Sequence, residues 1–337
     1  MTSTNSIADQ FDAYGKIAAR LVGLEDYFVK TQTYWDFRDR VFSILEAREQ
    51  RLQAGMTELK GAALIGDAGA GKSRIAKEII AEYHAATAED VNRKFGKHIV
   101  SIVVPGRSTV QYTLTEILGV LGYPIERARK ERYLTSLVVK HMKENGVIAL
   151  HLDEVQNSGR YKTSDSIGYF MKNFRNLMQH QEWPVCLILT ATPEGRDFVT
   201  QDPTLTRRLR PIEMRPLDFR TDGEVFRNAI RTLLERAKLA PADELLAQNE
   251  FIKILFHAAN YRFGVAMEMT IEAIGECLGA KRREIDIGDF AEAYAVRMDC
   301  DDELNPFWAE NWSVIDTNLA LQRHEVDHLR KRRRPKK

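Results

Sequence analysis

Short apolar runs alternate with amphipathic stretches up to about residue 217, and this alternation predicts an α/β fold. Between the apolar runs, hydrophobic side chains recur at helical spacing, as in Ile75, Ile79 and Tyr83. Helices that join consecutive strands imply a mostly parallel sheet flanked by helices. Four runs have the character of buried strands, at residues 62–65, 97–104, 147–153 and 185–189.

The pattern is helical only after about Leu217, which predicts a second, all-α domain. Its helices are expected at residues 221–238, 243–259, 264–279 and 287–297. The chain is thereby divided into four expected regions: an N-terminal helical segment at 1–50, the α/β domain at 51–216, a small all-α domain at 217–300 and a C-terminal segment at 301–337.

The net charge of +1 hides an uneven distribution. The last residues, from Leu321 to Lys337, carry a net charge of +6, which leaves about −5 on the rest of the chain. The end of this segment is too charged to pack, and we expect a disordered basic tail. Because the body is slightly acidic, contact with DNA must come from a local basic patch or from this tail.

The composition excludes several classes of protein. Hydrophobic residues make up 44% of the chain and charged residues 29%, as in an ordinary soluble globular protein. No apolar stretch approaches the roughly 18 residues that a membrane span needs, and the N-terminus lacks a signal-peptide pattern. Three widely spaced cysteines suggest neither a disulfide framework nor a zinc site. We therefore expect a cytoplasmic protein without membrane contact.

The stretch Gly66–Ser73 has the pattern G-x-x-x-x-G-K-[ST] and lies between the first apolar run and a helical pattern. Strand, glycine-rich loop and helix together are the context of a phosphate-binding loop. Its glycines allow backbone N–H groups to surround phosphate oxygens, and the helix N-terminus adds partial positive charge. In such a loop Lys72 reaches the β- and γ-phosphates of a nucleotide, and Ser73 holds a magnesium ion. The residues expected to bind ATP are Gly66, Asp67, Ala68, Gly69, Ala70, Gly71, Lys72, Ser73 and Arg74.

Two adjacent acids, Asp153 and Glu154, end the apolar run that begins at Val147. At the carboxyl end of a buried parallel strand they would face the same crevice as the phosphate loop. Asp153 is then expected to bind magnesium through water, and Glu154 to polarise the water that attacks the γ-phosphate. A small-molecule kinase must exclude water and does not need the second acid. The pair therefore favours ATP hydrolysis with Mg²⁺ as cofactor.

The order of these motifs resembles that of the AAA+ ATPases: a phosphate loop, an Asp-Glu strand, a polar residue after the fourth strand, an arginine pair and a helical lid. Within that superfamily the chain resembles the TniB and TnsC regulators of transposition over about residues 35–290. The resemblance implies an AAA+ core with a parallel sheet and a small all-α lid. The resemblance to the TniB and TnsC regulators is carried by Leu152-Asp153-Glu154-Val155-Gln156 and by Ile188-Leu189-Thr190-Ala191-Thr192-Pro193-Glu194.

By this resemblance Thr192 is the polar sensor that contacts the γ-phosphate or its attacking water, with Thr190 as the alternative. Arg208 is the expected arginine finger, preferred over Arg207, and acts on the ATP of a neighbouring subunit. An arginine used in this way implies a homo-oligomeric ring or filament. The lid departs from the superfamily pattern, since Met267 lies where many members have an arginine.

Ring-forming relatives bind DNA with residues that follow the second strand, and the resemblance implies that role here for Arg107 and Ser108. A second basic cluster is expected at the start of a helix over 126–144. Basic and hydroxyl side chains that contact phosphates would bind double-stranded DNA with little sequence preference. The second cluster comprises Arg127, Arg129 and Lys130.

The resemblance implies an ATP-dependent, DNA-binding oligomer that marks target DNA and recruits or activates a transposase, with a target-selection protein as a further partner. ATP hydrolysis would control its assembly. The same core also fits an AAA+ helicase loader or plasmid replication factor, which would bind a helicase instead. A signalling NTPase outside the AAA+ group would have no use for Arg208 in a neighbour's site.

Overall fold

The structure is a computed structural model of the 337-residue chain and describes residues 7–94, 96–106, 108–157, 164–200, 203–242 and 244–318. The chain forms two compact units. One unit comprises Lys30–Arg215, and the other combines Met1–Val29 with Pro216–Lys337. The helical segment expected over 1–50 is therefore shared between the two units.

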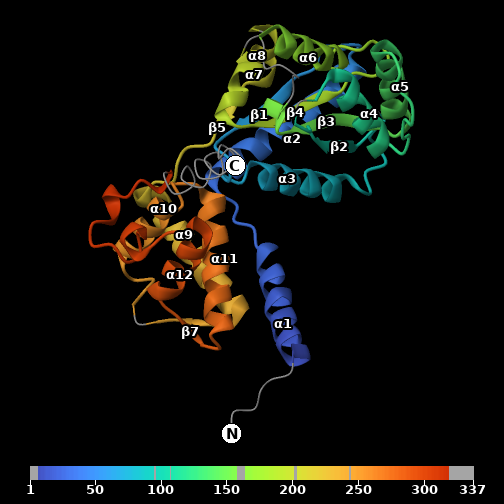
Figure 1. The fold of residues 1–337 in the computed structure, drawn as a ribbon. Helices are drawn as coiled ribbons and strands as arrows, with labels where there is room; N and C mark the ends of the chain where they lie inside the picture. The colour runs from blue at the N-terminus through green and yellow to red at the C-terminus, as the bar shows by residue number, and fades with distance from the viewer. Residues whose placement is uncertain are drawn as a thin grey trace, which may run out of the picture. The chain divides into compact units, whose positions relative to one another are not determined.

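Five parallel strands form the sheet of the Lys30–Arg215 unit, in the order β2-β3-β4-β1-β5 (Figure 1). Every residue of β1, β3 and β4 is buried, as expected for strands that helices cover on both faces. Because all strands run in the same direction, the carboxyl ends of β1, β3 and β4 lie at one edge of the sheet. The strands are β1 (Gly61–Ile65), β2 (His98–Val103), β3 (Val147–Asp153), β4 (Cys186–Ala191) and β5 (Ile212–Glu213).

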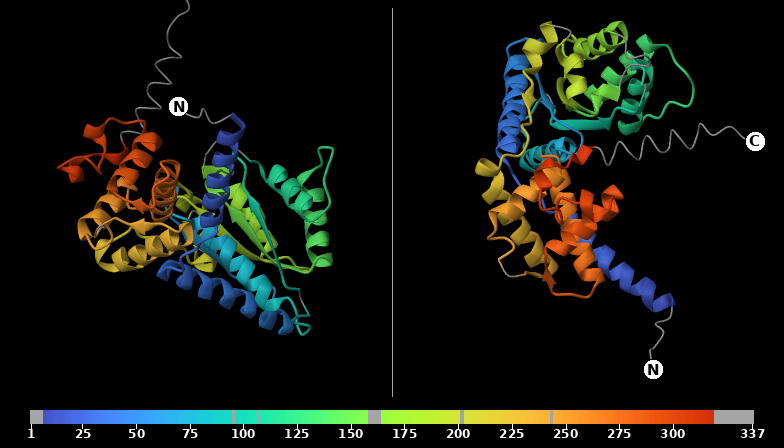
Figure 2. Two further views of the ribbon diagram at one scale, coloured as in Figure 1. Left: turned by 90° about the horizontal axis from the view of Figure 1, so that it is seen from below. Right: turned by 60° about the vertical axis from the view of Figure 1, so that its left-hand side comes forward.

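Two layers of helices cover this sheet (Figure 2). Leu150 and Leu152 of β3 and Leu187 of β4 point into a core cluster under the larger layer. The 3-10 turns η1 (Val155–Asn157) and η2 (Pro193–Gly195) follow β3 and β4. The larger layer consists of α4 (Val110–Val120), α5 (Glu131–Glu144), α6 (Ser164–Leu177), α7 (Arg196–Thr200) and α8 (Pro203–Leu209), and the opposite face is covered by α2 (Gln32–Gln53) and α3 (Lys72–Thr87).

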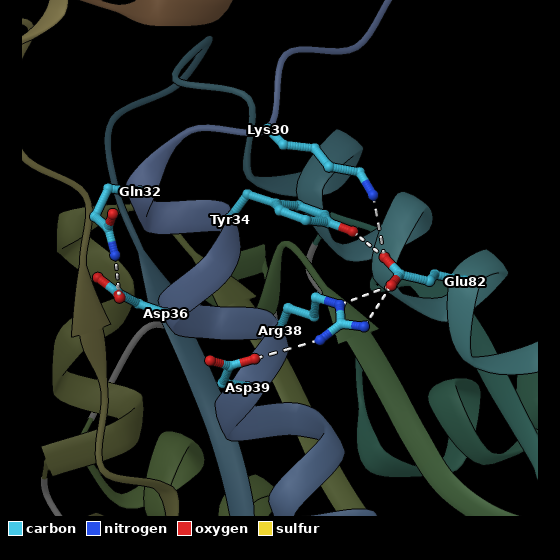
Figure 3. A network of polar contacts seen from close by, with 7 residues as sticks. All are labelled: Lys30, Gln32, Tyr34, Asp36, Arg38, Asp39 and Glu82. Atoms are coloured by element: carbon cyan, nitrogen blue, oxygen red, sulfur yellow. Dashed lines mark hydrogen bonds and ion pairs between the residues drawn. The ribbon is translucent and has the colours of Figure 1, made fainter. Parts of the chain in front are cut away.

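A network of polar contacts fastens α2 to α3, the helix that follows the predicted phosphate loop (Figure 3). Glu82 of α3 accepts two hydrogen bonds from the Arg38 guanidinium, from Nε at 2.7 Å and from Nη2 at 2.5 Å. It also accepts one from the Tyr34 hydroxyl and contacts the Lys30 ammonium at 3.5 Å. The hydrogen bonds from Arg38 lower the pKa of Glu82 to about 2. The carboxylate therefore stays ionised and ties the start of α2 to α3.

The second unit is mostly helical, with one short parallel strand pair that the expected all-α domain lacks, and its core contains Phe226, Phe251, Phe256 and Phe290. Their rings meet edge to face, as between Phe226 and Phe256, whose centroids are 5.3 Å apart. Met267 is 8% exposed in the same core. The elements of this unit are α1 (Ile7–Glu25), α9 (Phe219–Ala237), α10 (Asn249–Ala258), α11 (Phe263–Gly279), α12 (Ile287–Met298), the parallel pair β6 (Ala240–Pro241) and β7 (Glu284–Ile285), and the turns η3 (Asp302–Leu304) and η4 (Trp312–Val314).

Two helices begin later than the sequence predicts. Helix α10 begins at Asn249 instead of residue 243, after a turn over 244–247. Helix α5 begins at Glu131 instead of residue 126, because Lys130 has extended backbone angles at its N-cap. The basic cluster expected at the start of that helix therefore lies in the preceding loop. Within the described ranges, no helix combines the length and the apolarity that a membrane crossing requires.

Candidate functional site

The loop Gly66–Ser73 links the carboxyl end of β1 to the first turn of α3. Gly71 has a φ of 101° directly before the helix, a conformation that residues with a Cβ rarely adopt. Gly66 is required for a different reason, because a Cβ there would lie 2.8 Å from the Cβ of Met214. The loop thus brings the first N–H groups of a 16-residue helix to the edge of the sheet. Its exposed residues are Asp67, Ala68 and Gly69, and Ala70 is buried.

Lys72 is the first residue of α3, and its side chain reaches back to the loop. Its Nζ donates to the carbonyl oxygen of Asp67 at 2.9 Å, and the residue is only 4% exposed. Burial lowers the pKa of Lys72, whereas the carboxylates of Glu154 and Asp153 act in the opposite direction. The ammonium therefore lies near both predicted catalytic acids.

Ser73 and Arg74 follow in the first turn of α3, and both are half-buried. The hydroxyl of Ser73 is thereby placed at the same end of the helix as the Lys72 ammonium. Arg74 forms an ion pair with Glu78 one turn further along the helix, with Nε and Oε1 separated by 2.9 Å. The positive charge of Arg74 is therefore paired with a carboxylate of its own helix.

Asp153 is the last residue of β3 and is 4% exposed. Its Oδ1 accepts a hydrogen bond from the hydroxyl of Thr190 on β4 and a second, at 3.0 Å, from the backbone N–H of Glu154. Two donors on one oxygen fix the orientation of the carboxylate. The other oxygen can then accept from water bound to a metal ion.

A chain of hydrogen bonds continues from Thr190 into the sheet. Nε2 of His151 lies 3.3 Å from Oγ1 of Thr190, and Nδ1 of His151 lies 2.8 Å from Oγ of Ser101 on β2. Since Thr190 donates to Asp153, its oxygen accepts from Nε2–H, and Nδ1 accepts from Ser101. His151 is 1% exposed, and burial lowers its pKa. A neutral imidazole therefore links β2, β3 and β4 through hydrogen bonds that end at the Asp153 carboxylate. These hydrogen bonds lie on the sheet face that α2 and α3 cover.

Glu154 has a left-handed backbone, with a φ of 58°. Its carboxylate accepts a hydrogen bond from Nε2 of Gln156. The Oε1 atom of Gln156 accepts in turn from the backbone N–H of Thr192 at 3.1 Å. The acid that follows β3 is thus connected to the segment that follows β4.

The two candidate sensor residues have different surroundings. Thr190 is fully buried, and its hydroxyl is engaged with Asp153. Thr192 is half-buried, and its side chain makes no capping hydrogen bond at the turn η2. The hydroxyl of Thr192 is therefore the better placed of the two to contact a bound phosphate, and its role as sensor stays a prediction.

The structure also separates the two candidate arginine fingers, which both lie in the last turn of α8. Arg208 is 7% exposed, and its Nη2 forms an ion pair with Oε1 of Glu58 at 2.7 Å in the same unit. Arg207 is exposed. A finger must extend from its own subunit to a neighbour's phosphate, and the burial of the Arg208 side chain and its ion pair with the exposed Glu58 oppose this. The geometry favours Arg207, the alternative of the pair.

The residues expected to bind DNA after the second strand are only partly described. Ser108 is buried, and its hydroxyl donates to the carbonyl oxygen of Pro105 at 2.5 Å. Such a side chain holds its own loop together and is not presented to DNA. Arg107 and the basic tail over 321–337 lie outside the described residues.

The second basic cluster is exposed, in the loop that precedes α5. The guanidinium of Arg129 lies 6.0 Å from the ring centre of Tyr133 in the first turn of that helix. The exposed cations of this loop are Arg127, Arg129 and Lys130. They remain candidates for phosphate contact.

The residues at this edge fit a nucleoside triphosphate with magnesium. The left-handed Gly71 has no atom within 4 Å of where a Cβ would be, so the backbone there is open to a ligand. Lys72 supplies a cation beside the helix N-terminus. The hydroxyl of Ser73 supplies an oxygen ligand of the kind that Mg²⁺ prefers, and the free oxygen of the Asp153 carboxylate can accept from water bound to the ion.

The sequence analysis assigned no role in the site to three residues that lie near it. His151 could have been found, because a histidine inside an otherwise apolar strand needs a hydrogen-bonding partner. Ser101 gives no such signal, and Gln156 was noted only as part of the segment that carries the family resemblance. Their roles depend on the register of β2 with β3 and on the direction of the turn after β3.

Comparison with known proteins identifies a family and a fold. The family described as bacterial TniB protein matches residues 29–218, which is more than half of the chain. Comparison with curated proteins finds no match.

Solved structures of origin-recognition proteins are similar to this chain. ORC2 of Aeropyrum pernix, in its ADPNP–ADP complexes, has a TM-score of 0.53 and 14% sequence identity, over 83% of this chain and 74% of that chain. ORC1 of the same organism, in complex with DNA, has a TM-score of 0.54 and 16% identity, over 77% and 66%. Drosophila ORC bound to DNA has a TM-score of 0.54 and 12% identity, over 86% and 67%.

At these identities the similarity concerns the fold. It confirms the expected parallel sheet flanked by helices, accompanied by a helical second unit. The family match confirms the resemblance that the Asp-Glu-Val-Gln and Thr-Pro-Glu segments indicated. The fold is the one expected of an AAA+ ATPase, and the chain belongs to the bacterial TniB protein family.

Proposed function

We propose that the protein is an ATP-dependent, DNA-binding oligomer that regulates transposition, by marking target DNA and recruiting or activating a transposase. A target-selection protein would be a further partner. The observation that most supports its dependence on ATP is the meeting of three parts at one sheet edge, where the loop after β1, the Lys72 ammonium and the acids after β3 lie together. Hydrolysis of ATP at this edge would control assembly.

The proposed reaction follows from the positions of these side chains. Glu154 accepts a proton from a water molecule, whose oxygen forms the new bond to the γ-phosphorus while the bond to the β–γ bridging oxygen breaks. Lys72 and the N–H groups at the start of α3 stabilise the phosphate oxygens. Ser73 directly and Asp153 through water would hold the magnesium ion, which would neutralise charge on the β- and γ-phosphates. ADP and inorganic phosphate are the products.

Assembly into a ring or filament is proposed because the site needs a further cation. Arg207 is exposed at the end of α8, and a neighbouring subunit could use it to stabilise charge on the γ-phosphate. Hydrolysis would then require contact between subunits. ATP turnover would then occur only in the assembly and would limit its lifetime.

DNA binding is supported by the exposed cations before α5 and by the similarity to ORC proteins solved with DNA. Contacts to phosphates give binding that tolerates different sequences and weakens as salt concentration rises. A patch made from several subunits would bind DNA strongly only after assembly. Its contribution should therefore depend on ATP, whereas a basic tail should bind with or without ATP.

Titration of a labelled DNA duplex, with and without a non-hydrolysable ATP analogue, tests this function. Replacing Arg127, Arg129 and Lys130 by alanine should remove the ATP-dependent part of binding. The matched control replaces Lys140 and Lys143, two exposed lysines further along α5, and should retain it. Deleting the residues after 328 should weaken binding at low salt and leave the ATP dependence intact.

Two results would contradict the proposal. If the tail deletion alone abolishes ATP-dependent binding, the loop before α5 is not the DNA-binding site. If the wild-type protein prefers single-stranded DNA and binds a helicase, it acts as a helicase loader or replication factor.

A further inference from the structure

The side chain of Gln156 bridges two parts of the site that the sequence motifs treat separately. Its Nε2 donates to Oε2 of Glu154, and its Oε1 accepts from the backbone N–H of Thr192 at 3.1 Å. One amide therefore touches both the acid that activates water and the segment of the predicted sensor.

The direction of the amide is fixed by its partners. The backbone N–H of Thr192 can only donate, so it must face the amide oxygen. The amide nitrogen then has to face Glu154, whose ionised carboxylate can only accept. A glutamate in place of Gln156 could keep the bond to Thr192 but would have no donor for Glu154.

The surrounding chain leaves space for this bridge and holds it in place. At Gly195, an added Cβ would lie 2.6 Å from the Cβ of Ala191 and 3.2 Å from the Cβ of Gln156. On the other side, Nδ2 of Asn157 donates to the carbonyl oxygen of Val104, which follows β2, at 3.3 Å. The turn η1 is therefore held between the segments that follow β2 and β4.

The conformation of Glu154 makes such support necessary. A φ of 58° is uncommon for a residue with a side chain, and it persists where neighbouring contacts fix it. The backbone N–H of Glu154 donates to Asp153, and its carbonyl oxygen accepts from the N–H of Asn157 at 2.9 Å. The Gln156 amide adds the contact that orients the carboxylate itself.

We propose that Gln156 is a positioning residue for ATP hydrolysis, which orients the Glu154 carboxylate and couples it to the segment at Thr192. Holding Oε2 leaves Oε1 of Glu154 to accept a proton from the attacking water. A displacement of Thr192 on phosphate contact would be transmitted through a single amide to Glu154. This inference rests on the proposed hydrolysis at the same site.

The test is the replacement Gln156→Glu, with steady-state phosphate release measured as a function of pH. Loss of the donor should lower kcat by about tenfold or more, with KM for ATP little changed, since general-base catalysis depends on orientation. A second carboxylate beside Glu154 favours protonation of the pair. The acidic limb of the pH–rate profile should therefore move to higher pH by about one unit.

The matched control is Asn157→Asp, which makes the same amide-to-acid change one residue further on, in a side chain that contacts Val104. It should leave the acidic limb where the wild type has it. A second variant, Gln156→Met, has similar length and no charge. It should lower kcat without moving the acidic limb of the pH–rate profile. If the glutamate variant does not fold, this variant alone tests the positioning role of Gln156.

The outcomes separate this inference from the proposed function. If the wild-type protein binds ATP but releases no phosphate under any condition of assembly, the proposed hydrolysis fails. If the wild type is active and both Gln156 variants retain its kcat and its pH profile, only the positioning role is wrong. Loss of kcat with equal shifts of the acidic limb in Gln156→Glu and Asn157→Asp would likewise reject that role.

Discussion

At the scale of single residues, buried polar side chains determine how Asp153 is presented to a metal ion. Ser101, His151 and Thr190 form a chain of hydrogen bonds with one direction, which ends on Oδ1 of Asp153. The chain requires a neutral imidazole, since protonated Nδ1 could no longer accept from Ser101. Burial maintains this state by lowering the pKa of His151.

His151 predicts a dependence of stability on pH. Its pKa in the folded chain lies below the ordinary value of 6.5, so acidification protonates the unfolded chain first. The free energy of unfolding should be unaffected by His151 above pH 6.5 and should fall as the pH decreases below it. At about pH 5.5 the loss should be about 1 kcal/mol.

Urea unfolding of the wild type and of His151→Leu, each at about pH 7.5 and about pH 5.5, measures this contribution. The leucine variant removes the titrating group, so the stability difference between the two proteins should shrink on acidification. Parallel changes in both proteins would show that His151 does not titrate as its burial implies.

At the scale of elements, the start of α2 is held on α3 through Glu82. Arg38, Tyr34 and Lys30 all contact this carboxylate, and α3 is the helix that begins with Lys72 (Figure 3). Movement of α3 would change the position of the phosphate loop. The contacts at Glu82 therefore help to hold the phosphate loop in position, although none of these residues belongs to the loop.

Glu82→Gln should lower the free energy of unfolding by about 1 kcal/mol, since it removes a half-buried ion pair with several partners. Its matched control is Glu78→Gln on the same helix, which removes only the more exposed pair with Arg74 and should cost less. Thermal unfolding of both variants makes the comparison. Because the pKa of Glu82 is low, its contribution should be complete above about pH 4.5 and be lost toward pH 2. Equal effects of the two substitutions would contradict the network.

The elements that the sequence predicts well are those with long apolar patterns. The runs before Gly66 and Asp153 form strands at the expected positions, because full burial requires uninterrupted apolar residues. The pair Ile212–Glu213 is too short to show a pattern, and it is a strand only because β1 offers an unpaired edge. The start of α5 at Glu131 differs from the expected residue 126 for a similar reason, since exposed residues leave a helix boundary unmarked.

The same limit applies to the site. Lys72, Asp153 and Glu154 were predicted because motifs fix their places on strand and helix ends. The burial of Arg208 could not be predicted, because its partner Glu58 lies far away in sequence, before β1. Hydrogen-bond partners such as Gln156 depend on the path of a turn.

At the scale of the whole molecule, the two arginines of α8 should have different effects. Arg207→Ala should abolish ATP turnover in the assembled protein and change the free energy of unfolding by less than about 0.5 kcal/mol, as expected for an exposed residue. Arg208→Ala should lower it by about 2 kcal/mol, because it removes a buried side chain with its ion pair. Phosphate release and thermal unfolding of each variant are the measurements.

Mixing two inactive variants tests whether Arg207 acts on the ATP of a neighbouring subunit. A Lys72→Ala variant lacks its own phosphate contact but retains Arg207, and Arg207→Ala retains an intact loop. Mixed assemblies should therefore recover part of the turnover at interfaces where the two complement each other. No recovery at any ratio, with a monomeric ATP-bound state by light scattering, would rule out an arginine supplied in trans.

We propose that ATP is hydrolysed where the loop Gly66–Ser73 meets Asp153 and Glu154. The most direct test is single-turnover phosphate release by Glu154→Gln, with bound nucleotide measured in the same sample. We expect the variant to retain ATP, because Lys72, Ser73 and Asp153 are unchanged, while phosphate release falls by about a hundredfold or more. Phosphate release at the wild-type rate would contradict the assignment of Glu154 and with it the proposed mechanism.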